Sequence, residues 1–139
     1  MIKLFEPHIS NEEVKSVTSV LKSKFWASGS GINNVKKFEN EFRRYTKSKQ
    51  CIAVNSGSAA LQLALSLFNV KNKEVIVPSL TFVSSVSSIV HNKGKPVFVD
   101  INSSNLCIDL HDLERKISKK TAAIIYVDFA GMTSNISEI

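Results

Sequence analysis

The stretch spanning residues 52–68 constrains the fold of this chain more than any other part of the sequence. It starts with the apolar run 52–54, crosses a small polar turn at 55–58, and continues as an Ala/Leu-rich segment. The apolar run predicts a short strand, and residues 59–68 predict a helix that is apolar nearly all round. We expect such a helix to be buried on more than one side.

The turn between these two segments has the chemistry of a phosphate-binding site. A small residue such as Gly57 lets the backbone approach a ligand closely, and the first N–H groups of a helix have no partner inside it. With the helix dipole these groups attract phosphate, and Ser56 and Ser58 add hydroxyl donors. The same residues are common in turns and N-caps, so a plain capped turn is an equally good interpretation. The turn lacks the further glycines of a dinucleotide fingerprint and the Gly-Lys-Ser/Thr of a P-loop.

Helical and strand patterns occupy the rest of the chain, with short links between them. A capping box of Ser10 and Glu13 starts one amphipathic helix, and apolar residues from Val35 to Tyr45 indicate another. Further strands are predicted at 74–78, 96–100 and 121–127, and further helices start near Val83, after the N-cap Asp109, and at Thr133. The alternation predicts an α/β fold with a mostly parallel sheet and flanking helices.

Three short loops follow predicted strands and therefore lie at the carboxyl edge of the predicted sheet. They comprise residues 55–58, 78–82 and 128–131. Parallel sheets bind their ligands beyond the carboxyl ends of the strands. We therefore expect a binding site where these loops meet.

Composition and charge narrow the possible functions. The 139 residues suffice for one domain or one piece of a larger one. The net charge of +6 comes from scattered lysines, which favours a solvated surface over a nucleic-acid-binding patch, with attraction of an anionic substrate as a further alternative. No apolar run approaches the ~20 residues of a membrane span, and the N-terminus lacks a signal-peptide core, so we expect no membrane contact and a cytoplasmic location. Cys51 and Cys107 indicate neither a metal site nor a disulfide framework.

Three blocks of the sequence, residues 54–65, 74–85 and 94–101, resemble the DegT/DnrJ/EryC1/StrS aminotransferases in order and spacing. The resemblance implies the aspartate-aminotransferase fold (fold type I) and the cofactor pyridoxal 5'-phosphate (PLP). It also implies transfer of an amino group from an amino donor, glutamate or glutamine, to a keto-sugar substrate. That sugar is usually nucleotide-linked and serves the biosynthesis of cell-surface polysaccharides or secondary metabolites. Residues 1–139 would then be a single incomplete large domain, with an N-terminal helix and loop in 1–32 and the α/β core in 33–139.

Four residues match the family's cofactor-binding positions. Ser56, Gly57 and Ser58 match its phosphate-binding turn, in which threonine is common at the position of Ser58. Phe82 matches the aromatic residue that stacks on the cofactor ring, a contact that contributes roughly 0.5–1.5 kcal/mol beyond area burial.

Three further residues are candidates for substrate contact. Trp26 and Ser28 resemble a loop near the substrate in the family, although a tryptophan here could equally seal the edge of the core. Asp128 stands where family members often carry histidine.

The resemblance places the family's catalytic lysine, and the acid that pairs with the cofactor's pyridinium nitrogen, beyond Ile139. PLP chemistry needs that lysine as a covalent anchor and proton carrier, and it needs the acid to keep the ring an electron sink. We therefore expect no catalytic residue and no transamination in this chain alone, and a homodimer or a complementing chain as partner. The alternatives are a non-catalytic binding or assembly module, a relic fragment, and part of a sugar dehydratase of the same family.

Overall fold

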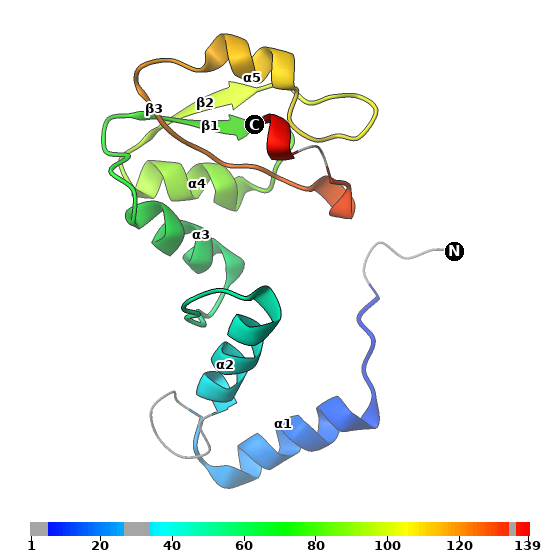
Figure 1. Ribbon diagram of the computed structural model, residues 1–139. Helices are drawn as coiled ribbons and strands as arrows, with labels where there is room; N and C mark the ends of the chain where they lie inside the picture. Colours follow the sequence, from blue (N-terminus) through cyan, green and yellow to red (C-terminus); the bar gives the residue numbers. More distant parts are fainter. Residues whose placement is uncertain (1–5, 27–33, 134–135) are drawn as a thin grey trace. The chain divides into compact units, whose positions relative to one another are not determined.

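The computed structural model describes residues 6–26, 34–133 and 136–139 of the chain (Figure 1). The chain divides into two compact units, Met1–Ala53 and Val54–Ile139. The first unit holds the helices α1 (Asn11–Ser23) and α2 (Asn34–Thr46), and the second holds a sheet and its helices. Within the described ranges, every helix lacks the length or the apolar character that crossing a membrane requires.

Helix α1 begins at the predicted capping box. The amide of Ser10 donates to Glu13 Oε2 at 2.6 Å, and Ser10 Oγ accepts from the amide of Glu12 at 3.1 Å. Hydrogen bonds from the side chain and the amide of Ser10 lower the pKa of Glu13 below its ordinary value. The box therefore satisfies backbone donors that the start of the helix would otherwise leave unpaired.

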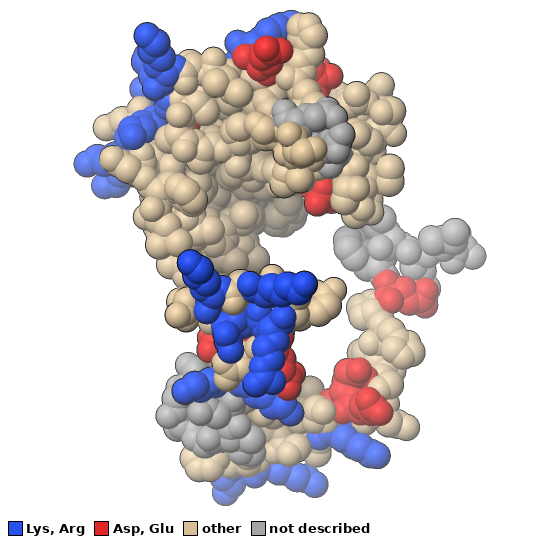
Figure 2. Space-filling view, viewed as in Figure 1, with Lys and Arg blue, Asp and Glu red and all other residues tan. Residues whose placement is uncertain are grey.

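Helix α2 forms where the spacing of its apolar residues predicts it. The rings of Phe38 and Phe42 lie 5.6 Å apart on its apolar face. Basic side chains gather over α2, with acidic ones between them (Figure 2). Neither α1 nor α2 buries a residue in the described structure, so the apolar faces of both helices are largely exposed.

The second unit is built on a parallel three-stranded sheet in the order β2-β1-β3. Its strands are β1 (Glu74–Pro78), β2 (Lys95–Val99) and β3 (Thr121–Ile124). The register places Ile76 of β1 opposite Val97 of β2 and Ile124 of β3. The central strand β1 is paired on both edges, and helices pack on both faces of the sheet, so its apolar run 75–77 is completely buried. The predicted parallel α/β sheet is confirmed.

Helices cover both faces of this sheet (Figure 1). They are α3 (Gly57–Ser66), α4 (Val83–His91) and α5 (Leu110–Lys116). On one face, Leu65 of α3 and Ile89 of α4 join a core cluster with β1 residues. On the other face, Leu113 of α5 packs with Ile76 and Val99 in a second cluster. The order of elements thus brings the N-termini of α3 and α4 to the same side of the sheet.

Residues 52–54 do not form the predicted strand. The segment has no partner in the described sheet, and the side chain of Ile52 is 72% exposed. A strand needs a neighbour to pair its amides and carbonyls, whereas the amide of Ala53 donates to Glu39 Oε1 at 2.9 Å instead. The prediction of a strand at residues 52–54 is therefore wrong for the described chain.

Helix α3 is less buried than its sequence predicts. It packs against α4 and reaches the core through Leu65, while Leu63 is 45% exposed. The prediction of burial on more than one side is wrong for the described chain, because α4 covers one side of α3 and the described residues leave Leu63 open. Apolar residues on all sides of a helix indicate how much apolar surface it could bury. They do not indicate how many other elements pack against it.

The C-terminal part of the chain also departs from the predicted elements. The ladder of β3 ends at Ile124 rather than at residue 127, although the amide of Ile125 still donates to the carbonyl of Ile76 at 2.8 Å. Beyond it lie two 3-10 turns, Phe129–Gly131 and Ile136–Glu138. The described residues of the helix predicted from Thr133 form the second of these turns and no α-helix.

Candidate functional site

The turn at residues 55–58 lies at the exposed N-terminus of α3. Ser56 is the N-cap: its backbone is extended, and Ser56 Oγ accepts a hydrogen bond from the amide of Ala59 at 3.2 Å. The carbonyl of Ser56 accepts the amide of Ala60 at 3.0 Å and closes the first turn of the helix. The interpretation as a capped turn is therefore correct for Ser56.

The amides of Gly57 and Ser58 donate no hydrogen bond within the described chain. The hydroxyl and carbonyl oxygens of Ser56 accept from the amides of Ala59 and Ala60 instead. A Cβ added to Gly57 would meet no atom within 4 Å, and the φ of Gly57 lies outside the left-handed region. Neither packing nor backbone conformation therefore requires glycine at this position. Two unpaired amides at a helix start, with open space at the Cβ position of Gly57, are suited to an anion, which the helix dipole also favours.

Ser58 connects this turn to the start of the neighbouring helix. Its Oγ lies 2.5 Å from Oγ of Ser84, which belongs to the first turn of α4. The contact joins residues 26 positions apart in the sequence. The N-termini of α3 and α4 therefore meet at one pair of hydroxyl groups.

Phe82 lies next to this meeting point. It is the N-cap residue of α4, it makes no capping hydrogen bond through its side chain, and it is 75% exposed. Because β1 ends at Pro78, Phe82 stands in the loop beyond the carboxyl end of the central strand. The structure thus brings the predicted phosphate-binding turn and the predicted ring-stacking residue to one end of the second unit.

Asp128, Trp26 and Ser28 are the predicted substrate contacts. Asp128 is exposed at the start of the 3-10 turn Phe129–Gly131, and no contact among the described residues joins it to Ser58 or Phe82. Trp26 belongs to the first unit, is 72% exposed, and donates from Nε1 to the carbonyl of Leu21 at 3.2 Å. It does not seal a core in the described chain. Ser28 lies outside the described residues.

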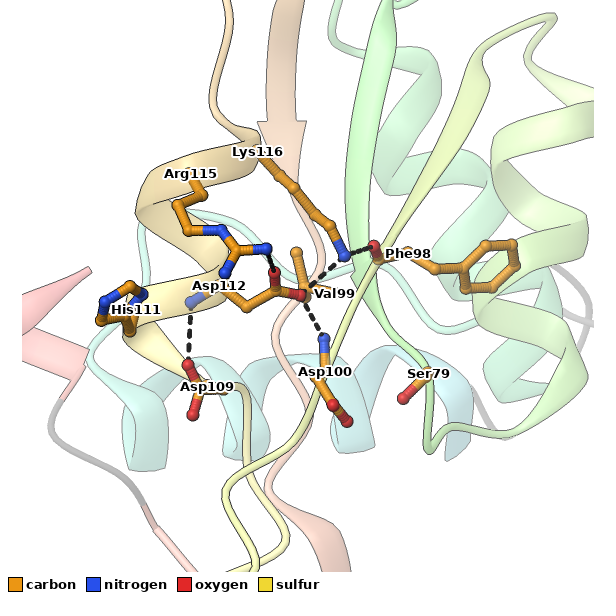
Figure 3. Close-up of a pocket in the computed structure, with 9 residues that line it drawn as sticks. All are labelled: Ser79, Phe98, Val99, Asp100, Asp109, His111, Asp112, Arg115 and Lys116. Atoms are coloured by element: carbon orange, nitrogen blue, oxygen red, sulfur yellow. Dashed lines mark hydrogen bonds and ion pairs between the residues drawn. The ribbon is translucent and has the colours of Figure 1, made fainter.

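A hollow of about 750 Å³ lies elsewhere on the second unit, between the end of β2 and α5 (Figure 3). Sequence reasoning did not point to it. Polar and charged residues outnumber apolar ones in its lining, which consists of Ser79, Phe98, Val99, Asp100, Asp109, His111, Asp112, Arg115 and Lys116. The signal that could have revealed it is the pair Asp112 and Lys116, spaced four residues apart after the N-cap Asp109.

The charged groups of this hollow bind one another (Figure 3). Asp112 Oδ2 accepts from Lys116 Nζ at 2.7 Å and from the amide of Asp100 at 2.8 Å, while Arg115 Nη2 lies 3.5 Å from Asp112 Oδ1. The hydrogen bond from Lys116, followed by that from the amide of Asp100, lowers the pKa of Asp112 below its ordinary value of 3.8. Lys116 Nζ also donates to the carbonyl of Phe98 at 2.9 Å. The network ties α5 to the end of β2.

Among the described residues, no cluster of His, Cys, Asp or Glu side chains could hold a metal ion.

Comparison with known proteins gives the context of these observations. The model of the DegT/DnrJ/EryC1/StrS aminotransferase family matches residues 7–139. A spore coat polysaccharide biosynthesis protein of Bacillus subtilis is 37% identical over 134 residues, which cover 96% of this chain and 34% of that protein.

Solved structures agree with the family match. A Streptococcus pneumoniae protein assigned as a sugar aminotransferase, solved in its PLP form, superposes with a TM-score of 0.87 at 33% identity over 99% of this chain and 34% of its own. An E. coli GDP-4-keto-6-deoxy-D-mannose-3-dehydratase with bound hydrated PLP gives a TM-score of 0.87 at 29% identity, over 97% of this chain and 36% of its own. The chain thus spans about a third of the length of the relatives it matches. The predicted fold, the N-terminal part of the large domain of the fold type I PLP enzymes, is confirmed.

Proposed function

Because this chain belongs to the DegT/DnrJ/EryC1/StrS aminotransferase family, we propose that it supplies the phosphate-binding turn and the ring-stacking residue of a PLP-dependent enzyme that aminates keto-sugars. The sugar would be nucleotide-linked, and its product would enter polysaccharide or secondary-metabolite biosynthesis. The names of the Bacillus and E. coli relatives support this substrate class. The observation that carries the proposal is the exposed start of α3, where the amides of Gly57 and Ser58 have no partner in the described chain and a Cβ at Gly57 would meet no atom within 4 Å.

The residues present fit the phosphate group of the cofactor. The amides of Gly57 and Ser58 and the hydroxyl of Ser58 would donate to it, and the space that a Cβ at Gly57 would enter leaves room for its oxygens. The hydroxyl oxygen of Ser56 would hold these donors in place by capping α3 rather than by binding the phosphate. Phe82, being exposed and without a packing role, would stack on the cofactor ring. PLP, when bound, supplies an electron sink for chemistry at the amino group.

The rest of the site lies outside this group of residues. No lysine of the sequence matches the family's covalent anchor, so we expect the 139-residue chain to bind the cofactor without transferring an amino group. Residues 1–139 would form one incomplete large domain, and Trp26, Ser28 and Asp128 would be the candidate substrate contacts. A homodimer or a complementing chain as partner, and a cytoplasmic location, belong to the same proposal.

A sugar dehydratase is the second candidate function. The likeness to the E. coli dehydratase, which is as close in fold as the likeness to the aminotransferase, favours keeping it. Both reactions use the same cofactor cradle, so the residues at the start of α3 serve either one. The products distinguish them: an aminotransferase yields an amino-sugar, and a dehydratase yields a sugar that has lost a hydroxyl group.

Calorimetric titration of pyridoxamine 5'-phosphate and of pyridoxamine into the 139-residue chain tests the proposal. These two compounds lack the aldehyde of PLP, so they do not condense with surface lysines, and they differ only in the phosphate. We expect the phosphate ester to bind more tightly. We expect Gly57→Val to weaken its binding by about 100-fold, because losing two hydrogen bonds to a charged group costs roughly 3 kcal/mol.

The matched control is Ala64→Val, which adds a β-branched side chain at an exposed position on the same helix, well away from the turn. Circular dichroism of each variant checks that α3 still forms. Equal affinity of wild type and Gly57→Val for pyridoxamine 5'-phosphate would contradict the phosphate site.

A further inference from the structure

The hydroxyl pair of Ser58 and Ser84 is the side-chain contact that joins the proposed phosphate turn to α4. The two Oγ atoms lie 2.5 Å apart, which is within hydrogen-bonding distance. Either atom can be the donor. In the described chain Ser84 is the group that contacts the Ser58 hydroxyl, so it has a direct effect on where that hydroxyl points.

Which serine donates decides what Ser58 can offer to a ligand. A serine hydroxyl carries one proton and two acceptor positions. If Ser58 donates to Ser84, its proton is used within the pair. If Ser84 donates to Ser58, the proton of Ser58 is free to reach an anion in front of the Gly57 and Ser58 amides. A bound anion accepts that proton, so it favours the second arrangement, in which each hydrogen bond of the chain polarises the next.

The side chain of Ser58 needs such a restraint because of its own chemistry. Serine is unbranched at Cβ, and an exposed serine distributes its hydroxyl among three staggered rotamers. A threonine at the same position would be restrained by its γ-methyl group instead. In the described chain, the side chain of Ser58 is in the rotamer that brings its hydroxyl to Ser84 of α4.

We propose that Ser84 is a positioning residue, which donates to Ser58 and thereby directs the Ser58 hydroxyl at the phosphate group of the cofactor. The inference rests on the proposed function, since it deepens the same site. Ser84 acts through Ser58 and does not itself touch the ligand. It belongs to the first turn of α4, beside Phe82, so it also couples the phosphate turn to the loop that carries the ring-stacking residue.

Binding of pyridoxamine 5'-phosphate and of pyridoxamine to the full 139-residue chain, measured for a set of serine variants, tests this role. We expect Ser84→Ala to weaken binding of the phosphate ester by about three- to tenfold, as expected for a lost rotamer restraint and a weakened hydrogen bond. Pyridoxamine, which lacks the phosphate, should bind Ser84→Ala and wild type equally. A purely structural role of Ser84 would affect both compounds alike.

Three further variants make the test specific. The double variant Ser58→Ala with Ser84→Ala should bind no more weakly than Ser58→Ala alone, because Ser84 acts through Ser58. Ser58→Thr in the Ser84→Ala background should restore the affinity, since the branched side chain restrains its own hydroxyl. Ser87→Ala is the matched control: it removes a hydroxyl from the same helix at a residue with no hydrogen-bonded side chain in the described structure.

The outcomes separate this inference from the proposed function. If Ser58→Ala and Gly57→Val weaken binding but Ser84→Ala does not, or if the effects of the two serine variants add independently, the positioning role is wrong and the phosphate site stands. If wild type, Ser58→Ala and Gly57→Val all bind the phosphate ester no better than pyridoxamine, the phosphate site is wrong and the role of Ser84 fails with it.

Discussion

Two polar regions of the second unit differ in whether their polar groups have partners. At the hollow beside α5, the carboxylate of Asp112 is bound by Lys116, by Arg115 and by the amide of Asp100. At the start of α3, the amides of Gly57 and Ser58 have no partner in the described chain. The first region is larger and more highly charged, and the second is a small exposed turn.

The difference shows why charge and size alone do not identify a binding site. Polar groups that satisfy one another stabilise the fold and offer little to a ligand, which would have to displace an existing partner. Exposed donors at a helix start are satisfied by water, which an anion replaces readily. The smaller region is therefore the better candidate site, and the hollow is a structural connection between α5 and β2.

Removing Asp112 should give the largest loss of stability in this comparison. Asp112→Ala breaks the contacts to Lys116, Arg115 and the amide of Asp100 together, so we expect a clear fall in the thermal midpoint, followed by circular dichroism. Affinity for pyridoxamine 5'-phosphate should stay unchanged at a temperature where the variant is folded. Glu114→Ala, an exposed change on the same helix, is the control. A folded Asp112→Ala protein with weakened binding would make the hollow part of the site.

Substitutions of the two serines in the α3 turn should have different effects, one on stability and the other on ligand binding. Ser56→Ala removes the N-cap, which should lower the free energy of unfolding by about 1 kcal/mol in urea titrations. Ser58→Ala should leave the free energy of unfolding nearly unchanged and weaken binding of the phosphate ester. If Ser58→Ala destabilises the chain as much as Ser56→Ala does, Ser58 has a structural role instead.

Phe82→Ala should weaken binding of the ring without affecting the phosphate turn. Loss of an aromatic stack of roughly 0.5–1.5 kcal/mol corresponds to about a two- to twelvefold loss of affinity, which should appear with both pyridoxamine and its phosphate ester. Competition by inorganic phosphate should be the same as in wild type. Val83→Ala, which shortens the next exposed side chain of α4, serves as control. A similar loss of inorganic phosphate binding would mean that Phe82 supports the turn through packing.

The smallest effect expected is a pH dependence at the hollow. The pKa of Asp112 is lower in the folded chain than its ordinary value of 3.8, so its ionised form stabilises the fold above that pH. The difference in free energy of unfolding between wild type and Asp112→Ala should be constant near neutral pH. It should shrink as the pH falls through 3.8 toward the folded pKa. Urea titrations across this range measure it, and a difference that grows toward acid pH would contradict the paired carboxylate.

Much of the fold could be predicted because its signals are local. The capping box at Ser10, the cap at Asp109 and the apolar run of β1 each depend on residues close in the sequence, and each forms as predicted. The strand expected at 52–54 failed because pairing depends on a neighbour that a local pattern does not specify. The prediction that α3 is buried on more than one side was wrong for the same reason.

The sequence by itself determined the alternation of strands and helices, the family to which the chain belongs, and the turn at residues 55–58. It could do so because caps, turns and apolar periodicity are properties of neighbouring residues. Only the tertiary structure decided that Ser58 meets Ser84 across 26 positions and that Asp112 is already bound by its neighbours. Such pairs form when helices pack on a sheet, because packing alone determines which distant side chains come within hydrogen-bonding distance.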